Sequence, residues 1–323
     1  MDAARPIVTF DAVRAATRRI AGRVHRTEVR TSATLDRELS ARVFFKAENL
    51  QKCGAFKARG ATNAVMALSD DEAKRGVITH SSGNHAAALA YAAQSRGIAC
   101  TVVMPKTAPK VKIDAVRGYG AEIVLCEAKD RDAVCAREQA ARGAVMVHPF
   151  ENLDVIAGQG TAAMELLEDV EDLDVILVPV GGGGLCAGTA ITVAAMRPSC
   201  QVIAAEPLAV DDAARSMATG VRQPRVENAC TWGDGLMTGL GAPNFEILLS
   251  HGLRVVTVTE DAMVDAARFF VERMKLVVEP SSATVLAAMR AIASELKGKR
   301  IGAILSGGNT DFAWLAPGVG KAT

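Results

Sequence analysis

Aromatic residues are scarce in this 323-residue chain, and so is charge of one sign. Only 4% of the residues are aromatic although half are hydrophobic, so Ala, Val, Leu and Ile must fill the core of roughly one to three domains. The net charge is +1, and no run of Lys and Arg is interleaved with aromatics. A nucleic-acid partner is therefore not expected, because proteins that bind nucleic acid present basic surfaces to the phosphates.

Paired cysteines and a clear membrane segment are also missing. The seven cysteines are odd in number and never spaced C-x-x-C, which argues against a disulfide framework and a structural zinc site. The first residues contain no apolar core of a signal peptide. Residues 175–196 are uncharged, but Pro179 and four successive glycines favour a strand, a loop and a helix over a membrane span. We expect a soluble, cytoplasmic protein with no membrane partner.

Short runs rich in β-branched residues alternate with longer, Ala-rich helical patterns. Strands are expected at residues 43–45, 76–79, 99–104, 122–126, 145–147, 173–180, 201–205 and 302–305. Helices are expected at residues 56–68, 84–95, 109–118, 130–142 and 185–196. This alternation predicts an α/β protein whose mostly parallel strands are covered by helices on both faces. The block 76–147 holds enough strand–helix units for an inserted subdomain.

Four consecutive glycines stand between a predicted buried strand and a helix: Gly181, Gly182, Gly183 and Gly184. Such a loop lets several backbone N–H groups point at one anion in front of a helix N-terminus. It has neither the Lys-Ser/Thr ending of a Walker A loop nor the G-x-G-x-x-G spacing of dinucleotide-binding proteins. The alternative is a tight turn, but four glycines cost backbone entropy, which favours a phosphate-binding loop.

Two further polar loops follow predicted strands. One is Ser81-Ser82-Gly83-Asn84-His85 and the other is Ser306-Gly307-Gly308-Asn309. Small hydroxyl residues and glycine before a helix can hold a carboxylate, although plain helix capping is the alternative reading. Because the carboxyl ends of parallel strands meet at one edge of a sheet, the three loops are expected to converge.

Lys57 stands at the start of a predicted helix, where the helix dipole favours anions. In apolar surroundings its pKa would fall, and the neutral amine would be a nucleophile. A solvated surface lysine is the alternative reading of this residue.

Taken in order, these motifs resemble the fold-type II pyridoxal-phosphate (PLP) enzymes, and within them the serine/threonine dehydratase and serine racemase group. The segments that carry the resemblance are residues 48–51, 54–61, 81–85, 181–184, 279–281 and 306–309. The resemblance implies two domains of open, mostly parallel twisted sheets flanked by helices, with the active site between them. Residues 1–70 and 150–323 would form the large PLP-binding domain and residues 71–149 a small domain that closes over substrate. It also implies a homodimer.

The resemblance implies a role for each cofactor-binding residue. Lys57 would hold PLP as a Schiff base and then act as the base at the substrate Cα, with Phe56 packed against the cofactor ring. The four glycines, residues 181–184, would cradle the phosphate. Asn84 would hydrogen-bond the ring hydroxyl, and Ser306 would face the pyridine nitrogen.

The same resemblance places the substrate, a small amino acid. Its carboxylate would be held by the loop that contains Ser81, Ser82, Gly83, Asn84 and His85, with Ser82 on the opposite side of Cα from Lys57. Arg131 falls where some family members direct an arginine to a distal carboxylate of the substrate. The alternative for Arg131 is a solvated helix arginine.

A divalent-cation site is also implied. Glu206, Val210 and Asp212 match the cation site of racemase-like members, and two carboxylates with one carbonyl suit Mg²⁺, Ca²⁺ or Mn²⁺. Without the resemblance, an acidic surface loop is the simpler reading.

The expected function is that of a dehydratase, an ammonia-lyase that converts a small β-hydroxy amino acid to a 2-oxo acid and ammonia. L-threonine and L-serine are the first candidate substrates. Phe150 stands where racemase-like members often carry asparagine, which favours the dehydratase reading. The alternatives are a 3-hydroxyaspartate dehydratase, a serine racemase, and a catalytically idle binding module on the same fold.

Overall fold

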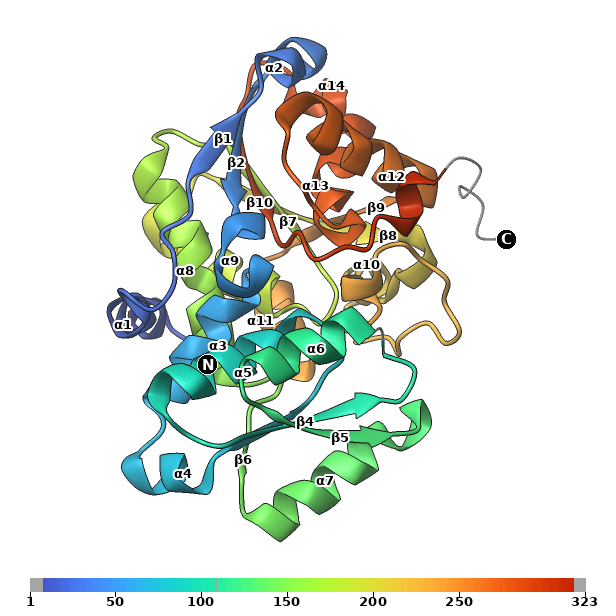
Figure 1. The fold of residues 1–323 in the computed structure, drawn as a ribbon. Helices are drawn as coiled ribbons and strands as arrows, with labels where there is room; N and C mark the ends of the chain where they lie inside the picture. Colours follow the sequence, from blue (N-terminus) through green and yellow to red (C-terminus); the bar gives the residue numbers. More distant parts are fainter. Residues whose placement is uncertain (1–7, 109, 317–323) are drawn as a thin grey trace.

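The computed structural model describes residues 8–108 and 110–316 (Figure 1). Its strands are β1 (Val29–Thr31), β2 (Arg42–Ala47), β3 (Val77–His80), β4 (Cys100–Pro105), β5 (Glu122–Cys126), β6 (Val145–Met146), β7 (Val175–Pro179), β8 (Gln201–Pro207), β9 (Arg254–Val258) and β10 (Arg300–Leu305). Its α-helices are α1 (Phe10–Ile20), α2 (Ala33–Leu39), α3 (Lys57–Ala67), α4 (Asp70–Arg75), α5 (Asn84–Arg96), α6 (Lys110–Gly118), α7 (Arg131–Arg142), α8 (Leu153–Asp169), α9 (Gly184–Met196), α10 (Asp212–Thr219), α11 (Ala242–Ser250), α12 (Glu260–Phe269), α13 (Pro280–Ala291) and α14 (Ala293–Leu296). None of the helices in the described ranges is long and apolar enough to cross a bilayer.

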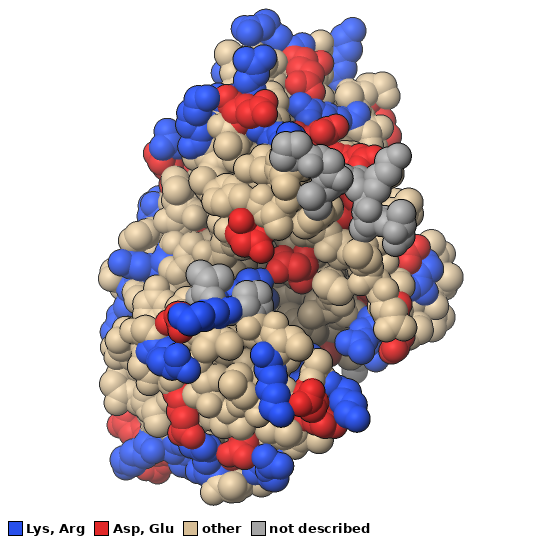
Figure 2. All heavy atoms as spheres, turned by 45° about the vertical axis from the view of Figure 1, so that its right-hand side comes forward, with Lys and Arg blue, Asp and Glu red and all other residues tan. Residues whose placement is uncertain are grey.

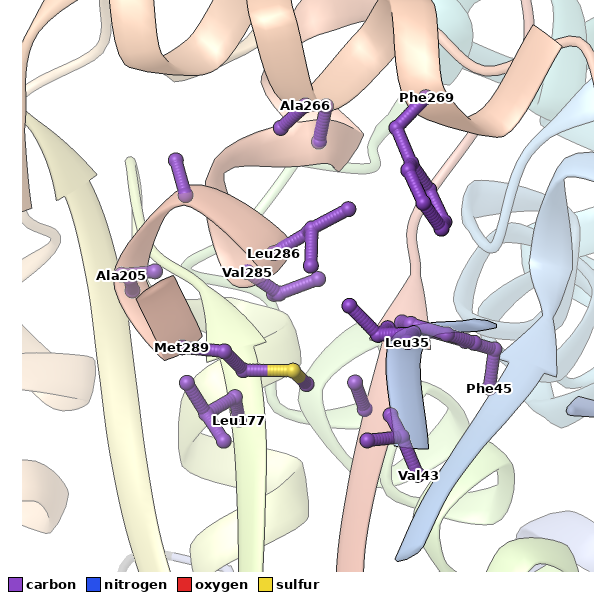
Figure 3. Packing of buried hydrophobic residues seen from close by; sticks show 14 of the residues in the cluster. Leu35, Val43, Phe45, Leu177, Ala205, Ala266, Phe269, Val285, Leu286 and Met289 are labelled. Atoms are coloured by element: carbon purple, nitrogen blue, oxygen red, sulfur yellow. The ribbon is translucent and has the colours of Figure 1, made fainter. Parts of the chain in front are cut away.

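Six strands form the larger sheet, in the order β1-β2-β10-β7-β8-β9. All its neighbouring pairs are parallel except β1 with β2 at one edge. Side chains alternate between the two faces of β7, so Val175 and Leu177 join a core with α2, α12 and α13, while Ile176 and Val178 join a core with α1, α8 and α9. Figure 3 shows the first of these cores, where Leu177 lies near Val285 and Met289 of α13.

Four parallel strands form a second sheet, in the order β5-β4-β3-β6, in the lower part of Figure 1. One face packs against α3, α5 and α6 and the other against α7. Val155 of α8 belongs to the first of these cores and joins the two parts of the molecule. The α/β class with two open, mostly parallel sheets flanked by helices is thus confirmed. The domain boundaries at residues 71 and 149 stay predictions, and Pro109, the expected first residue of α6, lies outside the described residues.

Helix α8 touches both α3 and α9 backbone to backbone. A Cβ placed on Gly158 of α8 would lie 2.7 Å from the Cα of Gly60 in α3. A Cβ on Gly188 of α9 would lie 2.6 Å from the backbone nitrogen of Gly160 in α8. Only glycine permits such close crossings, so the spacing of α3, α8 and α9 is set by their backbones.

Candidate active site

Lys57 begins α3, and the segment before it runs along the end of β10. Ala55 forms an isolated β-bridge with Gly307, and the Phe56 N–H donates to the Ser306 carbonyl at 2.9 Å. The Lys57 ammonium donates to the Pro149 carbonyl at 2.8 Å and lies 5.0 Å from the centre of the Phe56 ring. Burial lowers the pKa of Lys57 to about 8, and the negative charge of Glu279 opposes this shift. The neutral, nucleophilic form of this amine is therefore far more populated near neutral pH than that of an ordinary lysine.

The glycine loop, residues 181–184, follows β7 and leads directly into α9. Gly183 has φ +90°, a conformation that L side chains rarely adopt. The Gly182 carbonyl accepts a hydrogen bond from the Asn244 side chain at 2.6 Å, and a Cβ on Gly182 would lie 2.3 Å from the Phe150 ring. Asn244 and Phe150 thus fix the position of the loop. The N–H groups at the start of α9 have no hydrogen-bond partners within the helix. This arrangement suits a phosphate.

The serine loop, residues 81–85, follows β3 and begins α5. The Gly83 N–H donates to the Ser81 hydroxyl at 3.3 Å, and a Cβ on Gly83 would meet nothing within 4 Å. His85 is buried with its Nε2 3.0 Å from the Val147 carbonyl, and burial lowers its pKa to about 3. The imidazole of His85 is therefore neutral and cannot attract a carboxylate by its charge. The feature of this loop that can bind an anion is the N-terminus of α5.

One cavity of about 520 Å³ brings these segments together. Its lining includes the expected residues Phe56, Lys57, Ser81, Ser82, Gly83, Asn84, His85, Arg131, Gly181, Gly182, Gly183, Gly184 and Ser306. The serine loop and Arg131 come from the part with the four-stranded sheet, and the others come mostly from the six-stranded part, so the cavity lies between the two sheets. The face in Figure 2 is hollowed near its middle, with Asp and Glu side chains at the upper rim and Lys and Arg below.

Arg131 lies in this cavity at the start of α7, with 31% of its side chain exposed. Its Nε is 3.5 Å from an oxygen of Asp132, and this buried nitrogen has no hydrogen-bond partner among the described residues. Arg131 is therefore brought to the cavity wall, and its role toward a substrate stays a prediction.

Several lining residues were not predicted. They are His80, Lys112, Asp132, His148, Arg225 and Asp234. His80 is the last residue of β3 and His148 lies two residues after β6, and their rings stack edge to face with centres 5.3 Å apart. The strand-end rule that found the serine loop could therefore have found both. Arg225 lies in the irregular segment after α10, and Asp234 begins a short 3₁₀-helix, residues 234–236. The sequence assigned no role to either residue.

The expected cation ligands lie away from this cavity, at the end of β8. The Glu206 carboxylate accepts from the N–H groups of Ala213 at 3.0 Å and Ala214 at 2.8 Å, and Asp212 accepts from the Leu240 N–H at 2.8 Å. Both carboxyl groups are almost fully buried, as is Val210. Among the described residues no group of three or more His, Cys, Asp or Glu side chains could hold a metal. The expected site has only two such side chains, Glu206 and Asp212, because its third ligand is the carbonyl of Val210.

Known proteins similar to this chain fall into one family. Residues 20–307 match the family model described as pyridoxal-phosphate dependent enzyme. The chain is 44% identical to a serine racemase of Dictyostelium discoideum, covering 96% of this chain and 97% of that protein. It is also 44% identical to a beta-hydroxyaspartate dehydratase of Paracoccus denitrificans, covering 95% of this chain and 98% of that protein.

Solved structures agree with this result. The crystal structure of the Dictyostelium serine racemase superposes with a TM-score of 0.90 at 45% identity, covering 94% of this chain and 99% of that one. The structure of maize serine racemase gives a TM-score of 0.92 at 42% identity, with 95% of each chain covered. The chain therefore belongs to the pyridoxal-phosphate-dependent enzymes of fold type II, among the ammonia-lyases and racemases that the sequence motifs predicted.

Proposed function

We propose that this protein is an ammonia-lyase that dehydrates and deaminates 3-hydroxyaspartate. The observation that carries the proposal is the position of Arg131, which lines the same cavity as Lys57 and the serine loop. A guanidinium in that place can pair with a second carboxylate, which serine and threonine lack. The name of the Paracoccus relative supports this choice of substrate, and so does that of a yeast relative, an L-threo-3-hydroxyaspartate ammonia-lyase 41% identical to this chain.

The residues of the cavity fit PLP. In the glycine loop, a Cβ on Gly181, Gly182 or Gly183 would clash with neighbouring residues, so the loop exposes bare backbone. Burial lowers the pKa of Lys57, so part of its amine is neutral. Ser306 is buried and lines the same cavity. We infer that Lys57 holds the cofactor, that residues 181–184 bind its phosphate, and that Phe56, Asn84 and Ser306 contact its ring. When bound, PLP withdraws electrons from the substrate Cα and so makes the Cα proton acidic.

The chain's own residues then perform the reaction. The serine loop binds the α-carboxylate, and Arg131 binds the β-carboxylate, so the Cα–H bond points at Lys57. The Lys57 amine takes the Cα proton, and the β-hydroxyl leaves from the neighbouring carbon as water. Hydrolysis of the remaining C–N bond returns one water, so 3-hydroxyaspartate gives oxaloacetate and ammonia.

A second candidate function is racemisation of serine. Ser82 lines the cavity with Lys57. If its hydroxyl delivers a proton to the opposite face of Cα, the substrate is inverted instead of dehydrated. The 44% identity to the Dictyostelium racemase supports this alternative, whereas Phe150 at the glycine loop supports elimination. L-Serine and L-threonine remain the alternative substrates of the dehydratase.

We expect Arg131→Ala to lower kcat/KM for 3-hydroxyaspartate about tenfold to a hundredfold, because a hydrogen-bonded charged pair contributes about 1.5–3 kcal/mol. The same change should alter kcat/KM for L-serine less than about threefold, since serine has no second carboxylate. Release of 2-oxo acid from the hydroxyaspartate isomers, L-threonine and both serine enantiomers measures both effects, and chiral analysis of recovered serine measures racemisation.

Arg137→Ala is the matched control, because Arg137 lies on the same helix with 68% of its side chain exposed. Equal losses on hydroxyaspartate and serine in Arg131→Ala would contradict the proposed substrate.

We also propose that Glu206, Val210 and Asp212 bind a divalent cation, Mg²⁺ being the first choice. Two buried carboxylates close in sequence are stabilised by a hard cation with oxygen ligands. Saturation with Mg²⁺ at about 100 times its Kd should stabilise the folded protein by about 2.7 kcal/mol, measured as a rise in Tm over chelator-treated protein. Asp212→Asn should abolish this rise, and Asp211→Asn should keep it. A Tm unchanged by Mg²⁺, Ca²⁺ and Mn²⁺ would refute the site.

The homodimer and the cytoplasmic location remain predictions. The seven cysteines are all free thiols, which supports a reducing compartment.

A further inference from the structure

Glu279 belongs to a motif that carried the family resemblance, yet the proposed reaction gives it no part. Glu279 precedes α13 and is 5% exposed. Its carboxylate makes no capping bond to α13, although a side chain at this position commonly bonds to the helix N–H groups. The carboxylate is directed elsewhere.

It faces Asn84, the residue expected to contact the cofactor ring. The Asn84 amide nitrogen donates to both Glu279 oxygens, at 3.0 and 3.2 Å. On its other side, the Asn84 oxygen accepts from the Asn309 amide at 2.9 Å, and Asn309 also donates to the Cys53 carbonyl at 2.7 Å. Because a carboxylate can only accept, Glu279 fixes which end of the Asn84 amide is the nitrogen.

The packing around this contact is tight. A Cβ on Gly307 would lie 2.7 Å from a Glu279 oxygen and 3.1 Å from the Asn84 amide nitrogen. Gly307 directly follows Ser306, so the glycine in this loop lets a carboxylate and an amide lie against the backbone beside the expected position of the pyridine ring. The contact also joins α5 of the four-stranded part to α13 of the six-stranded part.

Charged groups approach Glu279 from three elements. Asp234 begins the short 3₁₀-helix at residues 234–236, Lys112 lies on α6 and Lys57 on α3. Lys112 pairs with Asp234 at 2.7 Å. Burial and, to a lesser degree, the charge of Asp234 raise the pKa of Glu279, while Asn84, Lys112 and the Asn309 N–H oppose the shift, and the resulting pKa is about 7. Above neutral pH the carboxylate is ionised, and its charge favours a protonated nitrogen at Lys57.

We propose that Glu279 is a positioning residue of the cofactor site, which orients the Asn84 amide toward the ring and places a negative charge beside the Lys57 nitrogen. This inference rests on the proposed function only in so far as Lys57 carries PLP; it is independent of the substrate.

The test is a pH titration of the visible absorbance of the cofactor-loaded protein, together with its Kd for PLP. Glu279→Gln keeps the size and one acceptor oxygen but removes the charge, so the pH at which the Lys57-linked chromophore loses its proton should fall by about one unit, a tenfold change in proton affinity. Asn309→Ala releases the other side of the Asn84 amide without changing charge. It should weaken PLP binding about fivefold or more and leave the midpoint within about 0.3 units.

Glu165→Gln is the matched control, since Glu165 is a buried carboxylate bonded to Arg59 and lines neither the cavity nor the Asn84 contact. A midpoint that is unchanged in Glu279→Gln, or that moves equally in Glu165→Gln, would overturn the inference. If Glu279→Gln does not fold, unchanged PLP affinity in Asn309→Ala overturns it instead. Wild-type protein without any borohydride-reducible absorbance would refute the proposed function itself, which is a different result.

Discussion

Replacing Lys57 by alanine is expected to lower kcat by at least about 10⁴-fold, the upper range of what a positioned base contributes, because we propose that the same amine also anchors the cofactor. The half-buried amine lies against Phe56 and the Pro149 carbonyl, and no other lysine except Lys112 lines the cavity in the part of the chain that the structure describes. Steady-state release of 2-oxo acid measures the rate. Mass analysis after borohydride reduction should find the cofactor on the peptide that contains Lys57 in the wild type only.

Lys106→Ala provides the control, because Lys106 is 61% exposed and pairs with Glu127 at the surface. Lys106→Ala should retain wild-type rate and adduct. Full activity with a reducible cofactor in Lys57→Ala would mean that another amine performs both tasks and that the active site has been assigned wrongly.

Arg59→Met is expected to lower the free energy of unfolding by about 3–5 kcal/mol, because it leaves buried carboxylates without their partner. Arg59 has no exposed side-chain surface and donates to Glu48 at 2.7 and 2.8 Å and to Glu165 at 2.7 and 2.8 Å. Lys46, equally buried, adds a bond to Glu165 at 2.7 Å. The network joins β2, α3 and α8, so its loss affects elements on both sides of Lys57.

Urea denaturation followed by circular dichroism measures this loss. Arg26→Ala is the comparison, since Arg26 is 51% exposed and pairs with Glu168 and Asp169 at the surface, where ion pairs contribute at most about 1 kcal/mol. A loss in Arg59→Met no greater than that in Arg26→Ala would show that the buried carboxylates are neutralised without Arg59.

The elements around the cofactor site could be predicted because their patterns are local. β7, the glycine loop and α9 follow from a β-branched run, a block of glycines and an Ala-rich run within one stretch of chain. The sequence did not predict α8, the longest helix among the described residues. Its Gly158 and Gly160 are unfavourable for an isolated helix, and only the backbone crossings with α3 and α9 explain them.

The three loops were predicted to converge at the edge of one parallel sheet, and this reason was wrong. They meet in one cavity, but the serine loop follows β3 of the four-stranded sheet, whereas the other two loops follow β7 and β10 of the six-stranded sheet. The Asn84–Glu279 hydrogen bond was not predicted, because the two residues are 195 positions apart. Asn84 belongs to the part with the four-stranded sheet and Glu279 to the part with the six-stranded sheet. The neutral state of His85 also could not be predicted from the sequence, because it depends on how deeply the ring is buried against Val147. Such contacts are products of tertiary packing.

The backbone crossings of α8 have a consequence for how substrate preference can diverge in this family. Lys57 begins α3 and the glycine loop leads into α9, so α8, which lies against both helices, fixes the distance between the Lys57 amine and the proposed phosphate-binding loop. Arg131, His80 and Phe150 lie outside these three helices. Mutations can therefore exchange the side chains that select the substrate without changing the distance between the Lys57 amine and the glycine loop. The same scaffold can then serve both lyases and racemases.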